Sequence, residues 1–142
     1  MTSRTRAWTL IDRPEGLPTR QHFALYEFDD PPLPEGEVRV RNLWLTVGPA
    51  IRVRMSPHTR GYLPPFALRK PMEGWAIGEV VASRSPALAE GDLVIHQHGL
   101  RDFGQGPAAG FEKLPKPGPP PYHYLNALGS TGYTAYVGLI QI

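Results

Sequence analysis

The sequence predicts a mainly β domain with one helical segment at its C-terminal end. Its 142 residues are the size of one ordinary domain, and 15 Gly and 17 Pro make up about a fifth of them. Pro lacks a backbone N–H and Gly weakens helix interiors, which disfavours a helical bundle. Hydrophobic residues are 41% and charged residues 20% of the chain, enough for a packed core. We therefore expect residues 1–142 to form a single domain of short strands joined by many turns.

The first third of the chain contains three predicted strands. Residues 7–11 alternate weakly before a turn at Pro14-Glu15-Gly16, and residues 23–28 follow as a second strand. Residues 29–36 form a loop stiffened by proline. The clearest strand covers residues 37–47, with apolar side chains at Val38 and Val40. Beyond Asn42 its apolar positions shift by one residue, which predicts a bulge or strong bend, as in barrel-like sheets.

The middle of the chain alternates between loops and two further strands. Residues 56–70 are an irregular loop, residues 75–83 a strand and residues 90–92 a tight turn. A strand over residues 93–96 precedes a loop rich in Gly and Pro over residues 104–121.

Only residues 122–142 have a helical pattern. Ser130 or Thr131 is the expected cap of the second half of this segment. Its apolar face is formed by Tyr133, Tyr136, Val137 and Ile140. Since a contiguous exposed apolar face usually finds a partner, we expect a homo-oligomer built through this helix.

Composition excludes several functional classes. The chain has no Cys, so it has no disulfide, thiolate ligand or Cys nucleophile. Its net charge is +2, and the basic residues do not form runs. The exceptions are the alternating pairs Arg39/Arg41 and Arg52/Arg54, which we interpret as solvated faces of strands. No aromatic residues interleave with a basic stripe, so nucleic acid is not an expected partner. No apolar run approaches the length of a membrane span, so we expect no membrane partner and a cytoplasmic location.

Six sequence stretches occur in an order that resembles a known family. They are LPEGEVRVRNLWLTVGP, IRVRM, YLPPF, PMEGWAIGEVVASR, GDLVI and LGSTGYTAYVGLIQI. Together they cover nearly the whole chain and resemble the leukotriene/prostaglandin reductase and 2-alkenal double-bond reductase family, within the zinc-less medium-chain dehydrogenase/reductase superfamily. The resemblance implies a GroES-like partial β-barrel with a C-terminal helix. It also implies that this barrel holds an enone substrate against the nicotinamide of NADPH.

The resemblance further implies a Rossmann domain after the helix. No G-x-G-x-x-G turn follows a strand in these residues, so no helix N-terminus is available for a pyrophosphate. We therefore expect a substrate-side domain that binds a hydrophobic α,β-unsaturated carbonyl compound. Alone it would bind no cofactor and transfer no hydride, and NADPH would bind only if a Rossmann domain followed.

Two alternatives stay open. One is a stand-alone, cofactor-free cyclase or isomerase that acts on a polyketide-like metabolite in natural-product biosynthesis, by shape and hydrogen bonding. The other is a non-catalytic domain that binds a small molecule.

Two histidines are candidate catalytic residues. His96 and His98 lie two apart at the end of a predicted strand, where the family usually has an apolar stretch. They could exchange protons near neutral pH, and His96 is also a candidate substrate-binding residue; alternatively, both could be exposed or satisfied by backbone carbonyls. No third ligand accompanies them, so no metal site is expected.

The remaining candidates depart from the family pattern or lie on its substrate loop. Ala50 stands where the family usually has Tyr, and Trp75 where it usually has Gly, so both would reshape the substrate pocket. Arg52 belongs to the family's Arg-x-Arg-Met pattern and could bind a carboxylate or enolate, or form a structural salt bridge. Tyr62 is a candidate catalytic and substrate-binding residue, as a hydrogen-bond donor to a carbonyl oxygen, and Phe66 is a candidate apolar wall of the substrate site.

Overall fold

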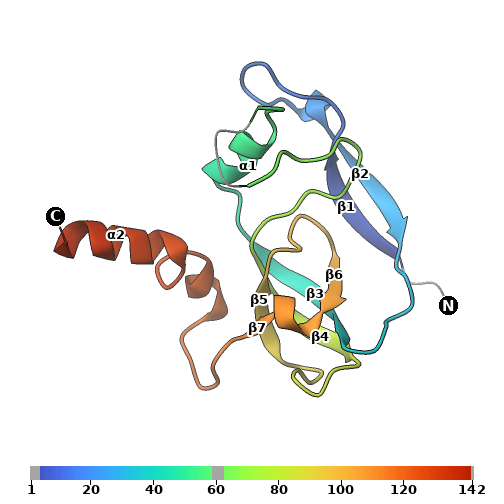
Figure 1. The fold of residues 1–142 in the computed structure, drawn as a ribbon, viewed down its shortest axis with the longest axis vertical. Helices are drawn as coiled ribbons and strands as arrows, with labels where there is room; N and C mark the ends of the chain where they lie inside the picture. Colours follow the sequence, from blue (N-terminus) through green and yellow to red (C-terminus); the bar gives the residue numbers. More distant parts are fainter. Residues whose placement is uncertain (1–3, 59–62, 142) are drawn as a thin grey trace.

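The computed structural model describes residues 4–58 and 63–141 and contains two antiparallel sheets (Figure 1). β1 (Arg4–Leu10) pairs with β2 (Phe23–Asp29) in a two-stranded ribbon. A five-stranded sheet has the order β6-β3-β4-β5-β7. Its strands are β3 (Glu37–Leu45), β4 (Ala76–Ser83), β5 (Leu93–His96), β6 (Phe103–Pro107) and β7 (Glu112–Lys113). These open sheets confirm the predicted mainly β, GroES-like partial barrel.

The bulge predicted in the third strand is present. The register between β3 and β4 shifts twice, between Arg39 and Val40 and again between Asn42 and Trp44. Gly78 of β4 lies against this irregular stretch, and a Cβ on it would come within 2.4 Å of the Arg41 carbonyl oxygen. Glycine is therefore the residue that lets the two strands approach so closely. The apolar residues beyond the bulge are not buried, since Leu43 and Leu45 stay exposed.

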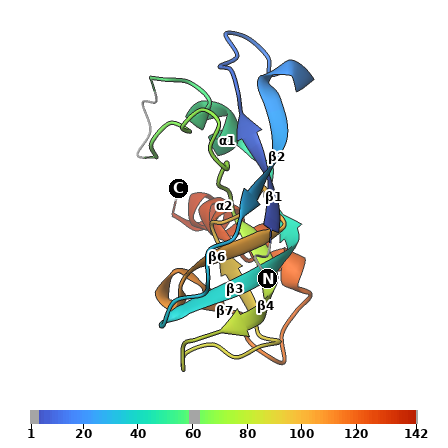
Figure 2. The same cartoon turned by 90° about the vertical axis from the view of Figure 1, so that its right-hand side faces the viewer.

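Two hydrophobic clusters form the core. The first lies on the inner face of the five-stranded sheet and comprises Val38, Val40, Val80, Leu88, Val94, Ala108 and Phe111. The second packs beneath the β1–β2 ribbon and comprises Leu10, Met55, Phe66, Met72 and Leu100. Figures 1 and 2 show the ribbon and α1 at one end of the molecule and the five-stranded sheet at the other.

Three elements correct the sequence predictions. α1 (Pro49–Arg54) is a helix of 6 residues, so the interpretation of Arg52 and Arg54 as a strand face was wrong. The segment over residues 104–121, which was predicted to be a loop, contains β7 and all but the first residue of β6. Their residues alternate too little in polarity to predict strands, and they are held in place by pairing with β3 and β5.

The C-terminal segment is helical in two parts. The 3₁₀ turn η3 (Pro121–Leu125) precedes the helix α2 (Ser130–Ile140). Gly129 is the N-cap of α2 and no side chain caps it, so the predicted cap at Ser130 or Thr131 was wrong. α2 extends to one side of the sheets (Figure 1), and Tyr133, Tyr136 and Ile140 are exposed on it. Among the described residues, neither helix is long and apolar enough to cross a membrane.

Candidate functional site

A cleft of about 440 Å³ opens between three segments that are distant in sequence. One wall is the turn between β3 and α1, a second is the loop before β4, and the third is the junction of η3 and α2. Its lining residues are Thr46, Val47, Gly48, Pro49, Ala50, Ile51, Arg54, Leu63, Glu73, Gly74, Trp75, Gln97, Leu125, Ser130 and Thr131. The cleft combines apolar walls with six polar or charged side chains, so it offers both apolar contact and hydrogen-bonding groups to a small molecule.

Backbone hydrogen bonds hold two walls of the cleft together. The Thr46 amide donates to the Trp75 carbonyl over 2.9 Å, and the Gly74 amide donates to the Gln97 carbonyl over 3.0 Å. The Gly99 amide donates to the Gly74 carbonyl over 2.9 Å, and a Cβ on Gly99 would lie 2.6 Å from that same oxygen. Glycine at position 99 is therefore needed for this contact. The loop that carries Trp75 is fixed at its backbone.

Arg54 is the one cationic side chain among the described lining residues, and it is 8% exposed. Its Nη2 lies 3.0 Å from Oε2 of Glu73, and its Nε donates to the Pro64 carbonyl over 2.9 Å. Its guanidinium carbon lies 4.2 Å from the centre of the Phe66 ring, a cation–π contact. Nη1 has no hydrogen-bond partner among the described residues.

The structure brings two of the predicted substrate-binding residues into the cleft. Ala50 lines the cleft from α1, and Trp75, which is 45% exposed, lines it from the loop before β4. Phe66 is buried beneath Arg54 and so supports the cleft without lining it. Arg52 points elsewhere, and its Nη2 donates to the Gly16 carbonyl over 2.7 Å. Tyr62 lies outside the described residues.

The two histidines form a separate cluster around Phe111. His96 is fully buried at the end of β5, and its ring centre lies 4.9 Å from that of Phe111. The ring of His98 stacks on the same phenyl ring at 5.4 Å. Neither imidazole lines the cleft. The structure thus brings His96 and His98 together, as their spacing predicts, but apart from Ala50 and Trp75.

Burial controls the protonation of this cluster. The burial of His96, with Arg101 and His98 nearby, lowers the pKa of His96 from 6.5 to about 3. Burial and the charge of Arg101 also lower the pKa of His98. The His98 amide donates to Nδ1 of His96 over 3.0 Å, so the proton of the neutral ring sits on Nε2. Nε2 is buried without a hydrogen-bond partner in the described part of the chain, and packing explains this imidazole better than proton transfer does.

Of the lining residues, only Ala50 and Trp75 were predicted as site residues, and the polar residues Glu73, Gln97 and Ser130 are among those that were not. Glu73 forms an ion pair with Arg54. The sequence feature that could have pointed to Glu73 is its position directly before Gly74 and Trp75. Gln97 lies between the two histidines, and Ser130 begins α2. No periodicity or motif marks Gln97 or Ser130, because they reach the cleft only through the packing of η3 and β5.

The described residues do not fit a dinucleotide or a metal ion. α1 is the helix that follows a strand most closely, but it has only 6 residues and begins at Pro49, which has no N–H to donate to a phosphate. α2 follows a 3₁₀ turn rather than a strand. Within residues 4–58 and 63–141, no three His, Asp or Glu side chains gather closely enough to hold a metal ion.

A family described as the N-terminal domain of oxidoreductase matches residues 6–114. The chain belongs to this family. It is a GroES-like N-terminal domain of the medium-chain reductase type, which confirms the resemblance seen in the sequence.

Named relatives of this GroES-like domain are reductases. It is 35% identical to the NADPH-dependent curcumin reductase of Escherichia coli (strain K12), covering 98% of this chain and 40% of the relative. It is 33% identical to prostaglandin reductase 1 of Rattus norvegicus, over 96% of this chain and 40% of the relative. The solved structure of CurA from Vibrio vulnificus in complex with NADPH matches it with a TM-score of 0.84 and 33% identity, over 96% of this chain and 40% of that one. The GroES-like domain thus spans about 40% of the length of these relatives.

Proposed function

We propose that the cleft binds a hydrophobic α,β-unsaturated carbonyl compound, as the substrate side of an NADPH-dependent double-bond reductase. The cleft between Ala50 and Trp75 carries this proposal, since it combines apolar walls with one buried cation. The names of the relatives, curcumin reductase and prostaglandin reductase, support the reaction class.

The polar groups of the cleft suit the carbonyl end of such a compound. Nη1 of Arg54 can donate a hydrogen bond to the carbonyl oxygen and so draw electrons from the conjugated double bond. Glu73, Pro64 and Phe66 fix the guanidinium, so it need not be ordered when the ligand binds. Tyr62 directly precedes the lining residue Leu63 in the chain and remains a proposed second donor.

Hydride transfer needs NADPH, and we propose that a dinucleotide-binding unit outside these residues holds it. NADPH supplies a hydride when it is bound, and its pyrophosphate needs a strand, a glycine-rich turn and a helix in succession. We propose that the GroES-like domain binds and orients the enone and that a separate dinucleotide-binding unit performs the reduction.

The alternative of a cofactor-free cyclase or isomerase receives no support from the geometry. This alternative acts by shape and hydrogen bonding in the cleft, and two of its candidate catalytic residues, His96 and His98, pack on Phe111 outside the cleft. The second alternative, a non-catalytic binding domain, would bind the same ligand in the same cleft. It differs from the lead proposal only because no reductase unit would then reduce the bound ligand.

Calorimetric titration with benzylideneacetone, a small aromatic enone, tests the proposed function. We expect saturable binding by the wild type, and a loss of at least about tenfold in affinity in Ala50→Trp, because the new indole fills the cleft. The control is Ala87→Trp, at an exposed alanine remote from the lining residues. Equal affinity in Ala50→Trp and Ala87→Trp would rule out this cleft as the site.

A further inference from the structure

Trp75 lies at the boundary between two cavities. A second cavity, of about 490 Å³, adjoins the cleft. Three residues line both spaces: Trp75, Leu125 and Ser130. The indole is therefore a shared wall, and a ligand in the cleft that extends past Trp75 enters the second cavity.

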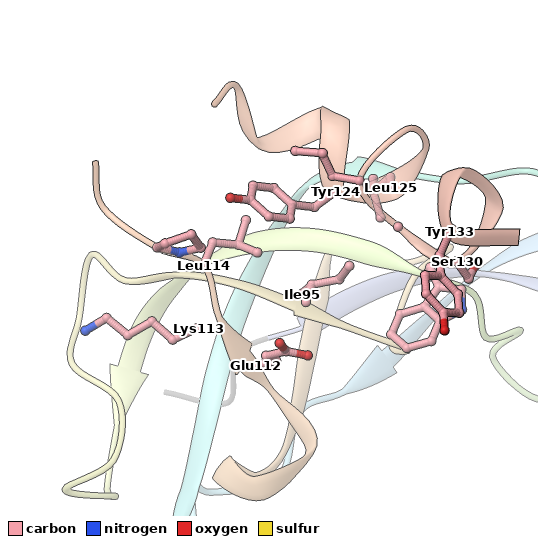
Figure 3. Close-up of a pocket in the computed structure, with 12 residues that line it drawn as sticks. Ile95, Glu112, Lys113, Leu114, Tyr124, Leu125, Ser130 and Tyr133 are labelled. Atoms are coloured by element: carbon pink, nitrogen blue, oxygen red, sulfur yellow. The ribbon is translucent and has the colours of Figure 1, made fainter. Parts of the chain in front are cut away.

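The second cavity suits an extended apolar chain. Ile95 of β5 contributes to its lining, with Leu114 beyond β7 and Tyr124 in η3 (Figure 3). Figure 3 shows Tyr133 and Ser130 at one end of the cavity and Leu114 and Lys113 at the other. Leu128, which is 56% exposed, lines this cavity and not the cleft.

The charges around the second cavity select against an anionic chain end. Glu112 is the register partner of Ile95, and its side chain extends toward the cavity (Figure 3). No ion pair engages Glu112 among the described residues, whereas the neighbouring Lys113 is paired with Asp92 at 2.8 Å. A ligand carboxylate placed here would meet an uncompensated negative charge.

We propose that the second cavity is a subsite for an uncharged alkyl tail, and that Trp75 sets the chain length at which the tail enters it. This inference rests on the proposed function, because the carbonyl end of the same ligand occupies the cleft. The substrate class is then a long-chain enone with an uncharged end. Glu112 is the residue that disfavours an anionic end.

Calorimetry with the methyl ketones heptenone, nonenone, undecenone and tridecenone tests the subsite. Once the chain passes Trp75, each added methylene buries apolar surface and should raise affinity by about fourfold at most. In Leu128→Trp the subsite is filled, so the ratio of tridecenone affinity to heptenone affinity should fall at least tenfold. Leu128→Asp, which places a charge on the same wall, should lower that ratio too, and circular dichroism verifies that both variants are folded.

The charge selection has its own measurement. The wild type should bind a tridecenone that carries a terminal carboxylate more weakly than it binds tridecenone itself. In Glu112→Gln the difference between these two affinities should be smaller.

The outcomes separate the two proposals. If heptenone and benzylideneacetone fail to bind the wild type, the proposed function fails, and the subsite fails with it. If heptenone binds but affinity stays flat along the series, or folded Leu128→Trp and Leu128→Asp keep the wild-type ratio, the subsite is overturned while the proposed function stands. If Glu112→Gln leaves the preference against the carboxylate unchanged, the assignment of Glu112 is overturned.

Discussion

The His98 amide donates a hydrogen bond to Nδ1 of His96 over 3.0 Å, and this contact requires a neutral imidazole. Protonation of Nδ1 would break the bond and place a cation near Arg101 in the protein interior. The pair therefore stabilises the fold only while His96 is neutral.

Stability should fall on acidification as a result. The pKa of His96 is lowered from 6.5 to about 3 in the folded state, so below pH 6.5 the unfolded chain binds a proton that the folded chain does not. The stabilisation of the fold by neutral His96 is complete above pH 6.5 and is lost progressively as the pH falls toward 3. The free energy of unfolding should decrease by roughly 1 kcal/mol per pH unit in this window, measured by urea denaturation.

A substitution of His96 distinguishes its contribution to acid destabilisation from that of other titrating groups. His96→Gln should reduce the loss of stability between pH 6.5 and 3, and the part that remains is expected from His98, whose pKa is also lowered by burial. An identical slope in His96→Gln and the wild type would refute the role of His96.

The ion pair of Arg54 and Glu73 should contribute more to stability than a surface pair. Arg54→Ala removes a buried guanidinium that also packs on Phe66, and should lower the free energy of unfolding by about 2–3 kcal/mol. Arg4→Ala, in exposed pairs with Glu27 and Asp29, should cost less than about 1 kcal/mol. Similar losses in both variants, measured by chemical denaturation, would contradict the structural role of Arg54.

Gly78 and Gly138 make a matched pair of glycine tests. A Cβ at position 78 would collide with the Arg41 carbonyl oxygen at 2.4 Å, so Gly78→Ala should destabilise the fold by about 1–3 kcal/mol. A Cβ at position 138, within α2, meets nothing within 4 Å, and Gly138→Ala should stabilise the fold by a few tenths of a kcal/mol to about 1 kcal/mol. Thermal unfolding of the two variants should shift in opposite directions, and a tolerated Gly78→Ala would refute the close strand approach.

Because apolar side chains on α2 are exposed, we still predict that the chain self-associates through this helix. Tyr133 is 71% exposed and Leu139 is 86% exposed, so a second copy of the chain could cover them. Light scattering should show an oligomer whose association weakens in Leu139→Arg. A wild type that stays monomeric at high concentration would contradict this prediction.

Local patterns predicted much of the fold. The shift of apolar positions after Asn42 predicted the irregularity in β3, but it did not predict burial, since Leu43 and Leu45 beyond the irregularity are exposed. The helix α1 was missed, since its 6 residues are too few for a period of 3.6 to show and Arg52 and Arg54 alternate as in a strand. Edge strand β7, with 2 residues, forms only through pairing with β5.

The candidate site was predictable only in part. Ala50 and Trp75 stood out as departures from the family pattern, and both line the cleft. The burial of His96 could not be predicted, because Phe111 covers it from a distant segment that has no clear pattern of its own. Arg54 is buried through contacts with Phe66 and Glu73 that no local spacing reveals.

Amide chemical shifts recorded during a titration with benzylideneacetone test the central claim most directly. Binding in the cleft predicts the largest shifts at Ala50, Gly74 and Gln97, on walls that are distant in sequence. The amides near Phe111 should shift least, since the histidine cluster lies outside the cleft. Shifts concentrated around Phe111, or no shift at saturating ligand, would contradict the assignment of this cleft as the enone site.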